Sequence, residues 1–349
     1  MPRLRRVDCA TPGIVRRRRG RGFEYIDING KRVEDLTVLQ RIKDLAIPPA
    51  WQDVWICPHP NGHLQAVGID QAGRKQYLYH EAWRRRRDQE KFDHMTQFAR
   101  ALPTLRAITT EHLAQDDMGR DRVLACSVRL LDRGFFRIGG ESYAQENETY
   151  GLATMRKEHV KLVKPRTVIF EYVAKSKKER YLSLVDPNVY EVVQALKRRR
   201  AGGDELLAYR ENRRWRDVRS SDINTYVKEI SNEDFSAKDF RTWHATVLAA
   251  VALAVSTEVV ATKSGRKRAV SRAMQEAAHY LGNTPAVSRS SYVDPRVVDR
   301  YEAGVTISGI LEDLGEVEAF GDPSLQGAVE EAVLDLIEGE DSAAIEKVS

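Results

Sequence analysis

Cysteine is scarce in this sequence of 349 residues, and the three that occur, Cys9, Cys57 and Cys126, lie far apart. Such spacing excludes a disulfide framework and a Cys-x-x-Cys zinc pattern. Long apolar runs are missing too, since the longest mostly apolar stretch, 245–256, is shorter than the ~20 residues that cross a membrane. No apolar region follows the basic N-terminus, so we expect no signal peptide and a cytoplasmic location.

Charge is abundant but unevenly distributed along the chain. The whole sequence carries a net charge of +5, whereas residues 311–349 contain twelve Asp or Glu and one Lys. The first 310 residues therefore carry +16 and the remainder −11. A single basic run such as 84–87 is typical of a solvated surface, but several runs spread over the body favour binding to a polyanion. We therefore predict a nucleic-acid-binding body and an acidic tail.

The first eighty-odd residues have the pattern of a small β-rich domain. Asn29-Gly30 is a strong hairpin signal because both turn residues need a positive φ. Further strands are predicted at 54–57, 63–70 and 74–80, with turns between them, while 47–51 is too proline-rich for a helix. On the last strand, Gln76 and Tyr77, if exposed, could reach base edges and phosphates in a DNA groove. Tyr77 and Leu78 could equally be the core and rim of a sheet.

Helical periodicity dominates from about residue 81. A strand pair at 167–173 and 180–185 interrupts it. The predicted fold class is α+β, with a β-rich domain at 1–85, a mainly helical domain at 86–310 that includes this hairpin, and an acidic tail at 311–349. Helices are predicted at 92–102, 122–132, 222–230, 245–255 and 272–281, with a short one in the tail. We interpret 263–268 as a basic loop.

Tyr292 is the candidate nucleophile, and the other candidate residues are those that could assist its attack. A free tyrosine, with a pKa of about 10, is a poor nucleophile at neutral pH. An attack on a phosphodiester therefore needs cations for the transition state and an acid for the leaving oxygen. Arg137 follows a helix and is flanked by aromatic and glycine residues, although the helix dipole alone would also favour an arginine there. Arg241 begins a buried helix, so it needs either a carboxylate partner or an anion.

Two further residues complete the candidate set. Lys175 lies at the tip of the 167–185 hairpin, where it could reach a leaving oxygen or merely solubilise the loop. Lys177 shares that tip. Asn283 directly follows Gly282, a residue suited to ending a helix.

At this point the chain resembles the type IB DNA topoisomerases of the poxvirus-like and bacterial kind, over about residues 20–300. The resemblance is carried by long, specific stretches. They are Ile-Pro-Pro-Ala-Trp at 47–51, Gly-Arg-Lys-Gln-Tyr at 73–77, Glu-Asn-Glu-Thr-Tyr-Gly at 146–151, Lys-Asp-Phe-Arg-Thr at 238–242 and Ser-Tyr at 291–292. The resemblance implies a monomer whose β-rich and helical domains close as a clamp around duplex DNA, in the cytoplasm at the nucleoid.

The resemblance also implies a mechanism. One strand is cut through a 3′-phosphotyrosine, the DNA swivels, and the strand is resealed without ATP, metal or another cofactor. Tyr292 is the expected nucleophile and Lys175 the general acid. Arg137 and Arg241 are expected to hold the non-bridging oxygens, and Asn283 to donate a further hydrogen bond. Many relatives have His at position 283, and Asn cannot carry a proton there. Gln76, Tyr77, Tyr79 and Tyr143 match DNA-contacting positions of the family.

The sequence supports three other functions less well. A tyrosine recombinase uses similar groups, but it usually carries His three residues before the second arginine, where this chain has Lys238. A non-catalytic architectural protein would bind DNA without needing Tyr292. A metal-dependent nuclease is poorly supported. Two pairs of residues that could bind a metal, Glu111-His112 and Asp116-Asp117, are close in sequence, but nothing else in the sequence indicates a metal site.

Overall fold

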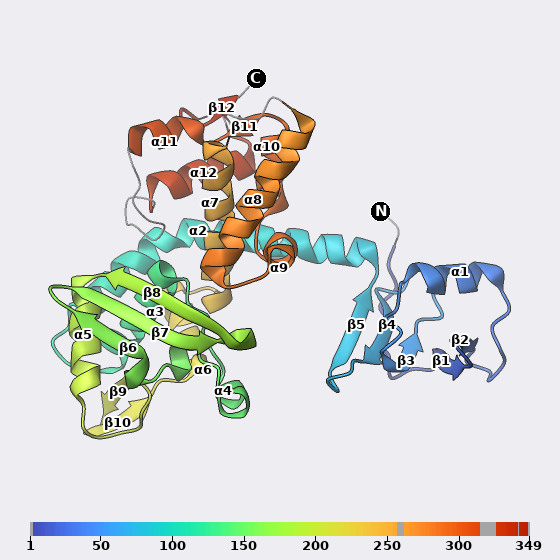
Figure 1. The fold of residues 1–349 in the computed structure, drawn as a ribbon, viewed down its shortest axis with the longest axis horizontal. Coiled ribbons are helices and arrows are strands. Elements are labelled where there is room, and N and C mark those ends of the chain that lie inside the picture. The colour runs from blue at the N-terminus through green and yellow to red at the C-terminus, as the bar shows by residue number, and fades with distance from the viewer. Residues whose placement is uncertain (1–2, 257–261, 315–325, 341, 348–349) are drawn as a thin grey trace. The chain divides into compact units, whose positions relative to one another are not determined.

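The computed structural model describes residues 3–256, 262–314, 326–340 and 342–347. The chain divides into two compact units, residues 1–93 and 94–349. The first unit is built on a five-stranded antiparallel sheet of order β2-β1-β3-β4-β5 (Figure 1). Its elements are β1 (Ile14–Arg19), β2 (Gly22–Ile26), α1 (Leu36–Asp44), β3 (Gln52–Ile56), β4 (Leu64–Ile69) and β5 (Lys75–Tyr79). α2 (Glu81–Leu113) runs from this unit into the second.

The first unit confirms a β-rich N-terminal region with strands at the three predicted places. The chain turns at 27–30, where the Gly30 N–H donates to the carbonyl of Asp27 (3.1 Å), and an isolated bridge joins Ile26 to Arg32 behind the turn. Gly30 has a positive φ (77°) but Asn29 does not, so the predicted turn with a positive φ at both residues was wrong. The basic N-terminus includes the arginine run 16–19, which is part of strand β1. Its Arg16 donates to the carbonyl oxygens of Pro48 (3.1 Å) and Trp51 (2.6 Å), and so fixes the proline-rich loop.

The second unit is mainly helical and carries a three-stranded antiparallel sheet of order β6-β7-β8 (Figure 1). Its helices are α3 (Arg120–Gly134), α4 (Glu141–Asn147), α5 (Pro187–Arg198), α6 (Ser220–Ser231), α7 (Ala237–Val255), α8 (Lys263–Leu281), α9 (Pro285–Ser291), α10 (Pro295–Glu302), α11 (Ser308–Leu314) and α12 (Ala328–Glu338). Its strands are β6 (Val160–Val163), β7 (Thr167–Ala174), β8 (Lys178–Val185), the pair β9 (Ala208–Glu211) and β10 (Arg214–Asp217), and the pair β11 (Val305–Thr306) and β12 (Glu346–Lys347). None of the helices within the described residues is long and apolar enough to cross a membrane. The α+β class predicted from the sequence is confirmed.

Helix α7 is the core of this unit, because nearly every residue from Phe240 to Ala254 is buried. It begins at a capping box in which the Asp239 carboxylate accepts from the backbone N–H of Ser236 (2.8 Å). α3, α8, α10 and α12 all pack against it. The alanine- and valine-rich composition of α7 permits this, since small side chains let several helices approach at once.

The interpretation of residues 263–268 as a loop was wrong, because α8 begins at Lys263. The Thr262 hydroxyl accepts from the backbone N–H of Gly265 (3.1 Å) and caps the helix. Lysine and arginine are good helix formers, and this preference together with the cap outweighs the single glycine.

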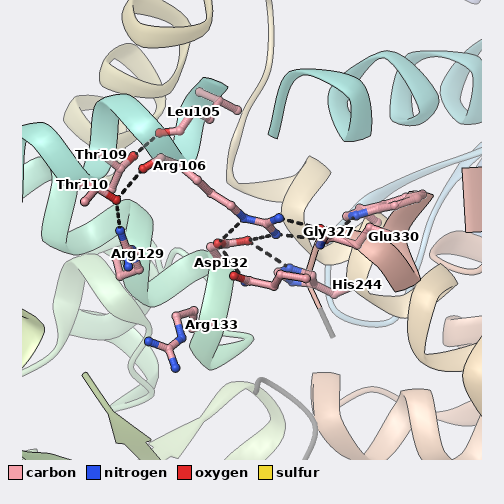
Figure 2. A network of polar contacts seen from close by, with 12 residues as sticks. Leu105, Arg106, Thr109, Thr110, Arg129, Asp132, Arg133, His244, Gly327 and Glu330 are labelled. Carbon is pink, nitrogen blue, oxygen red and sulfur yellow. Dashed lines mark hydrogen bonds and ion pairs between the residues drawn. The ribbon is translucent and has the colours of Figure 1, made fainter. Parts of the chain in front are cut away.

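The expected acidic tail, 311–349, contributes α12 to the helical unit. A buried network joins this helix to α2, α3 and α7 (Figure 2). Arg106 donates to Asp132 (2.9 Å) and to Glu330 (2.9 Å), while Trp243 donates to Glu330 (2.9 Å). Burial alone would raise the pKa of Asp132, but hydrogen bonds and charge from His244 and Arg106 hold that pKa far below its usual range. The Asp132 carboxylate thus lies ionised between α2 and α7.

Candidate active site

A cavity of about 290 Å³ in the second unit collects most of the catalytic candidates. Arg137, Lys175, Arg241 and Tyr292 all line it, from four separate segments of the chain. The remainder of its wall comprises Ile138, Gly139, Gly140, Thr149, Tyr150, Ala237 and Lys238. A small cavity whose charged groups are mainly cations is suited to an anion the size of a phosphodiester.

Arg137 stands on a loop that leaves α3 through Phe135, which has a left-handed backbone (φ 54°). The backbone N–H of Leu152 donates to the carbonyl of Arg137 (2.8 Å) and fixes the loop. Gly139 faces Gly151 so closely that a Cβ atom on Gly139 would lie 2.9 Å from the Gly151 Cα. The glycines therefore permit a close backbone approach that holds Arg137 in place.

Arg241 lies one turn into α7 and is only 5% exposed. Its guanidinium donates to the carbonyl oxygens of Phe135 (3.0 Å) and Leu281 (2.8 Å). Burial, together with repulsion from Arg137, lowers the pKa of Arg241 to about 10, although Tyr292 opposes the shift. Of the two sequence-based explanations, a carboxylate partner is not what holds this side chain; it is held by carbonyl oxygens and keeps a net positive charge.

Asn283 follows α8 and is 8% exposed. Its Oδ1 accepts from Arg137 and, at 3.5 Å, from Arg241. Because arginine can only donate, Oδ1 must face the two guanidinium groups, which leaves Nδ2 to donate elsewhere. Nδ2 is buried and has no hydrogen-bond partner among the described residues, and Asn283 is not part of the cavity wall.

Lys175 starts the short 3₁₀ turn η3 (Lys175–Lys177) at the tip between β7 and β8. Ser176 and Lys177 both have positive φ, 66° and 55°, so the chain reverses within this turn. Lys175 lines the cavity, whereas Lys177 is not part of its wall.

Tyr292 lies between α9 and α10. Its backbone N–H donates to the carbonyl of Ser288 (3.0 Å), and its carbonyl accepts from the Thr246 hydroxyl (3.3 Å) on α7. The ring lies 5.4 Å from the Arg241 guanidinium carbon. Burial would raise the pKa of Tyr292, but the charge and hydrogen bond of Arg241, together with the charges of Arg137 and Lys238, lower it. The site therefore stabilises the phenolate relative to that of a free tyrosine.

Lys238 was not selected from the sequence as a site residue. It lies three residues before Arg241 on α7, so both side chains share a helix face, and it lines the cavity. The sequence signal that could have revealed Lys238 is its position three residues before Arg241, which was already a candidate.

The candidates of the first unit lie on β5. Tyr77 and Tyr79 are 45% and 39% exposed, and their rings stack with centroids 6.2 Å apart. Side chains alternate along a strand, so Gln76 belongs to the opposite face, where it donates to Asp70 (2.9 Å). Gln76 and Tyr77 therefore do not point the same way. Tyr143 belongs to α4, and its side chain lies outside the described part of the structure.

Comparison with known families gives the assignment. The family model for the catalytic core of eukaryotic DNA topoisomerase I matches residues 80–312, and that for the N-terminal domain of bacterial DNA topoisomerase IB matches residues 22–70. The chain belongs to the type IB DNA topoisomerases. This confirms the resemblance found in the motifs, and the chain is accordingly a topoisomerase enzyme.

Individual relatives agree with the family assignment. DNA topoisomerase 1B of Acanthamoeba polyphaga mimivirus is 29% identical over 297 residues, which cover 83% of this chain and 88% of the relative. DNA topoisomerase 1B of vaccinia virus (strain Copenhagen) is 19% identical over 234 residues, covering 67% of this chain and 71% of the relative. DNA topoisomerase 1 of Candidozyma auris is 28% identical over 161 residues, which cover 46% of this type IB enzyme and 20% of the fungal protein.

Proposed function

We propose that this enzyme relaxes supercoiled DNA by cutting one strand through a 3′-phosphotyrosine, letting the DNA rotate, and resealing the strand, without ATP or metal. The single observation that supports this best is Tyr292, whose hydroxyl is held beside Arg241 with a lowered pKa in a cavity lined by three more cations. A phenolate next to paired guanidinium groups is the arrangement that attack on a phosphodiester requires.

In the cleavage step the Tyr292 oxygen forms a bond to phosphorus and the bond from phosphorus to the 5′ oxygen breaks. Lys175 gives that oxygen its proton, and Arg137 and Arg241 bind the non-bridging oxygens. Asn283 donates its buried Nδ2 hydrogens to the phosphoryl group. Resealing runs the same step backwards. One phosphodiester is exchanged for another, so the bond energy is conserved and no external energy source is needed.

The proposed substrate is duplex DNA, bound at the nucleoid in the cytoplasm by a monomer that closes as a clamp. The net charge of +16 on the first 310 residues supports a polyanionic partner. On β5, the exposed Lys75, Tyr77 and Tyr79 share one face of the strand, so we assign the groove contacts to that face rather than to Gln76. Tyr143 remains a proposed DNA contact.

The test is relaxation of negatively supercoiled plasmid in EDTA without nucleotide. We expect the wild type to relax the plasmid and Tyr292→Phe to be inactive. Tyr181→Phe is the matched control, because Tyr181 is an exposed tyrosine on β8, and it should relax the plasmid normally. A strict requirement for Mg²⁺ or ATP would refute the mechanism. Relaxation by Tyr292→Phe would mean that another residue is the nucleophile. If the wild type and both variants bind DNA but none of them relaxes the plasmid, the protein has an architectural role.

A further inference from the structure

The C-terminal end of α8 is surrounded by cations. The last four carbonyl groups of a helix have no partner within the helix, and each must be satisfied from outside. α8 ends in a Schellman motif, in which Asn283 N–H donates to the carbonyl of Ala278 (2.9 Å) and Gly282 N–H to that of His279 (3.2 Å). Gly282 has φ +66°, which this motif requires of its glycine.

The next four carbonyl groups, 280–283, each accept from a different cationic side chain. Arg241 donates to Leu281 (2.8 Å) and Arg137 to Gly282 (3.3 Å). Arg180 donates to Tyr280 and Lys178 to Asn283 (3.2 Å). We call carbonyls 280–283 the carbonyl row. Two of its four donors are the arginines of the proposed mechanism, and the other two have no role in it.

Arg180 is held tightly. One of its guanidinium nitrogens donates to the carbonyl of His279 (2.9 Å) and the other to that of Tyr280 (2.5 Å). On the neighbouring strand β7, burial raises the pKa of Tyr172, and the charge of Arg180 opposes that rise, so the guanidinium lies near the phenol. A Cβ atom at Gly282 would lie 3.5 Å from the same guanidinium, so Arg180 lies directly against the turn that leads to Asn283.

Lys178 and Arg180 are two residues apart on β8, so they point to the same face of the hairpin. The tip of that hairpin bears Lys175. The two side chains therefore connect the hairpin whose tip carries the proposed general acid to the helix end that precedes Asn283. The negative end of the α8 dipole, close to its last turn, also favours these cations.

We propose that Arg180 and Lys178 are positioning residues of the active site, which hold the carbonyl row so that it orients Arg137, Arg241 and Asn283 for the reaction. This inference rests on the proposed function. The carbonyl row is the shared anchor: when Arg180 is removed, the helix end loses two bonds, and the carbonyl oxygens that orient Arg241 and Arg137 shift with it. Neither Arg180 nor Lys178 lines the cavity, so their effect on the reaction is indirect.

The experiment measures single-turnover cleavage of a duplex at saturating enzyme, together with DNA affinity by titration, for Arg180→Met. A displacement of about 1 Å in a catalytic group can cost about 100-fold in rate, so we expect cleavage to slow by at least about tenfold while the dissociation constant changes less than about threefold. Arg180→Lys should recover part of the rate, because it restores a charge and one donor. The rising limb of the cleavage rate against pH should move to higher pH, since Arg241 and Arg137 lower the pKa of Tyr292.

Arg166→Met is the matched control. Arg166 is an exposed cation on the same sheet, in the turn between β6 and β7, and its loss removes the same charge far from the carbonyl row. We expect its cleavage rate and pH profile to equal those of the wild type. If Arg180→Met does not fold, Lys178→Met and Arg180→Lys carry the test, with a smaller loss of rate at unchanged affinity.

The inference is overturned if folded Arg180→Met cleaves like Arg166→Met, or if its rate and affinity fall in equal proportion. Failure of the wild type to form a covalent adduct through Tyr292 would instead refute the proposed function. The two failures are therefore distinguishable in one series of assays.

Discussion

Glu330 connects the acidic C-terminal segment to the core of the helical unit, and its replacement by leucine tests that connection. The Glu330 carboxylate accepts from two nitrogens of Arg106 and from Trp243 Nε1 (2.9 Å) (Figure 2). Leucine fills a similar volume but accepts nothing. Arg106 keeps Asp132 as its second partner, whereas the buried Trp243 N–H loses its acceptor.

The expected cost follows from these contacts. A hydrogen bond to a charged group contributes about 1.5–3 kcal/mol net, and a buried donor left without an acceptor costs about 1–3 kcal/mol. Removing one partner of a buried ion pair costs about 3–5 kcal/mol. We therefore expect Glu330→Leu to lower the free energy of unfolding by about 3–5 kcal/mol. Glu330→Gln, which keeps one acceptor oxygen, should cost about 1.5–3 kcal/mol.

The assay is urea unfolding followed by far-ultraviolet circular dichroism, which gives the midpoint and the slope of the transition. Glu331→Leu is the control, because Glu331 is the exposed neighbour of Glu330 on the same helix and its substitution is the same chemical change. Its free energy of unfolding should stay within about 0.5 kcal/mol of the wild type. Equal midpoints for the two leucine variants would refute the argument that the network anchors α12.

Three further outcomes are expected. Arg241→Gln should slow cleavage by about 100- to 1,000-fold, as loss of a preorganised oxyanion donor does. It should also move the rising limb of the pH–rate profile to higher pH, because the arginine lowers the pKa of Tyr292. A limb at unchanged pH would contradict this electrostatic role. Folding lowers the pKa of Asp132, so the ionised carboxylate stabilises the fold above its unfolded pKa of about 3.9, and this stabilisation is lost as the pH falls through the folded pKa. Asp132→Asn should therefore be less stable than the wild type at pH 7. The difference in free energy of unfolding between the two proteins should shrink when unfolding is measured in acid. Raising NaCl from about 50 to about 200 mM should weaken DNA binding by about 10³-fold or more if at least six phosphates are contacted, and binding that is flat across salt would exclude the basic body as the DNA surface.

Much of the fold could be predicted because its signals are local. The hairpin of β7 and β8, the buried helix α7 and the glycine that ends α8 each have a period or a turn residue that specifies them. Strand β1 was missed because its four consecutive arginines carry no alternating pattern, and Ile14 is the one buried residue of this strand. The start of α8 was missed because a cap at Thr262 offsets a glycine three residues later.

The residue types of the site were readable from the chain, but their mutual arrangement was not. Lys238 was overlooked, although it lies one helical turn from Arg241. The opposite directions of Gln76 and Tyr77 follow from strand alternation, and only the contact of Gln76 with Asp70 settles which face each one takes.

The sequence by itself determined the class of fold, the family and the set of groups able to perform metal-free phosphoryl transfer, because motifs, periodicity and charge are properties of the chain order. Only the tertiary structure decided that Arg137, Lys175, Arg241 and Tyr292 share one cavity, and that the C-terminal segment supplies a buried partner for Arg106. It also decided that four cations converge on the end of α8. These features depend on burial and on distances between segments up to 224 residues apart, which no local pattern encodes.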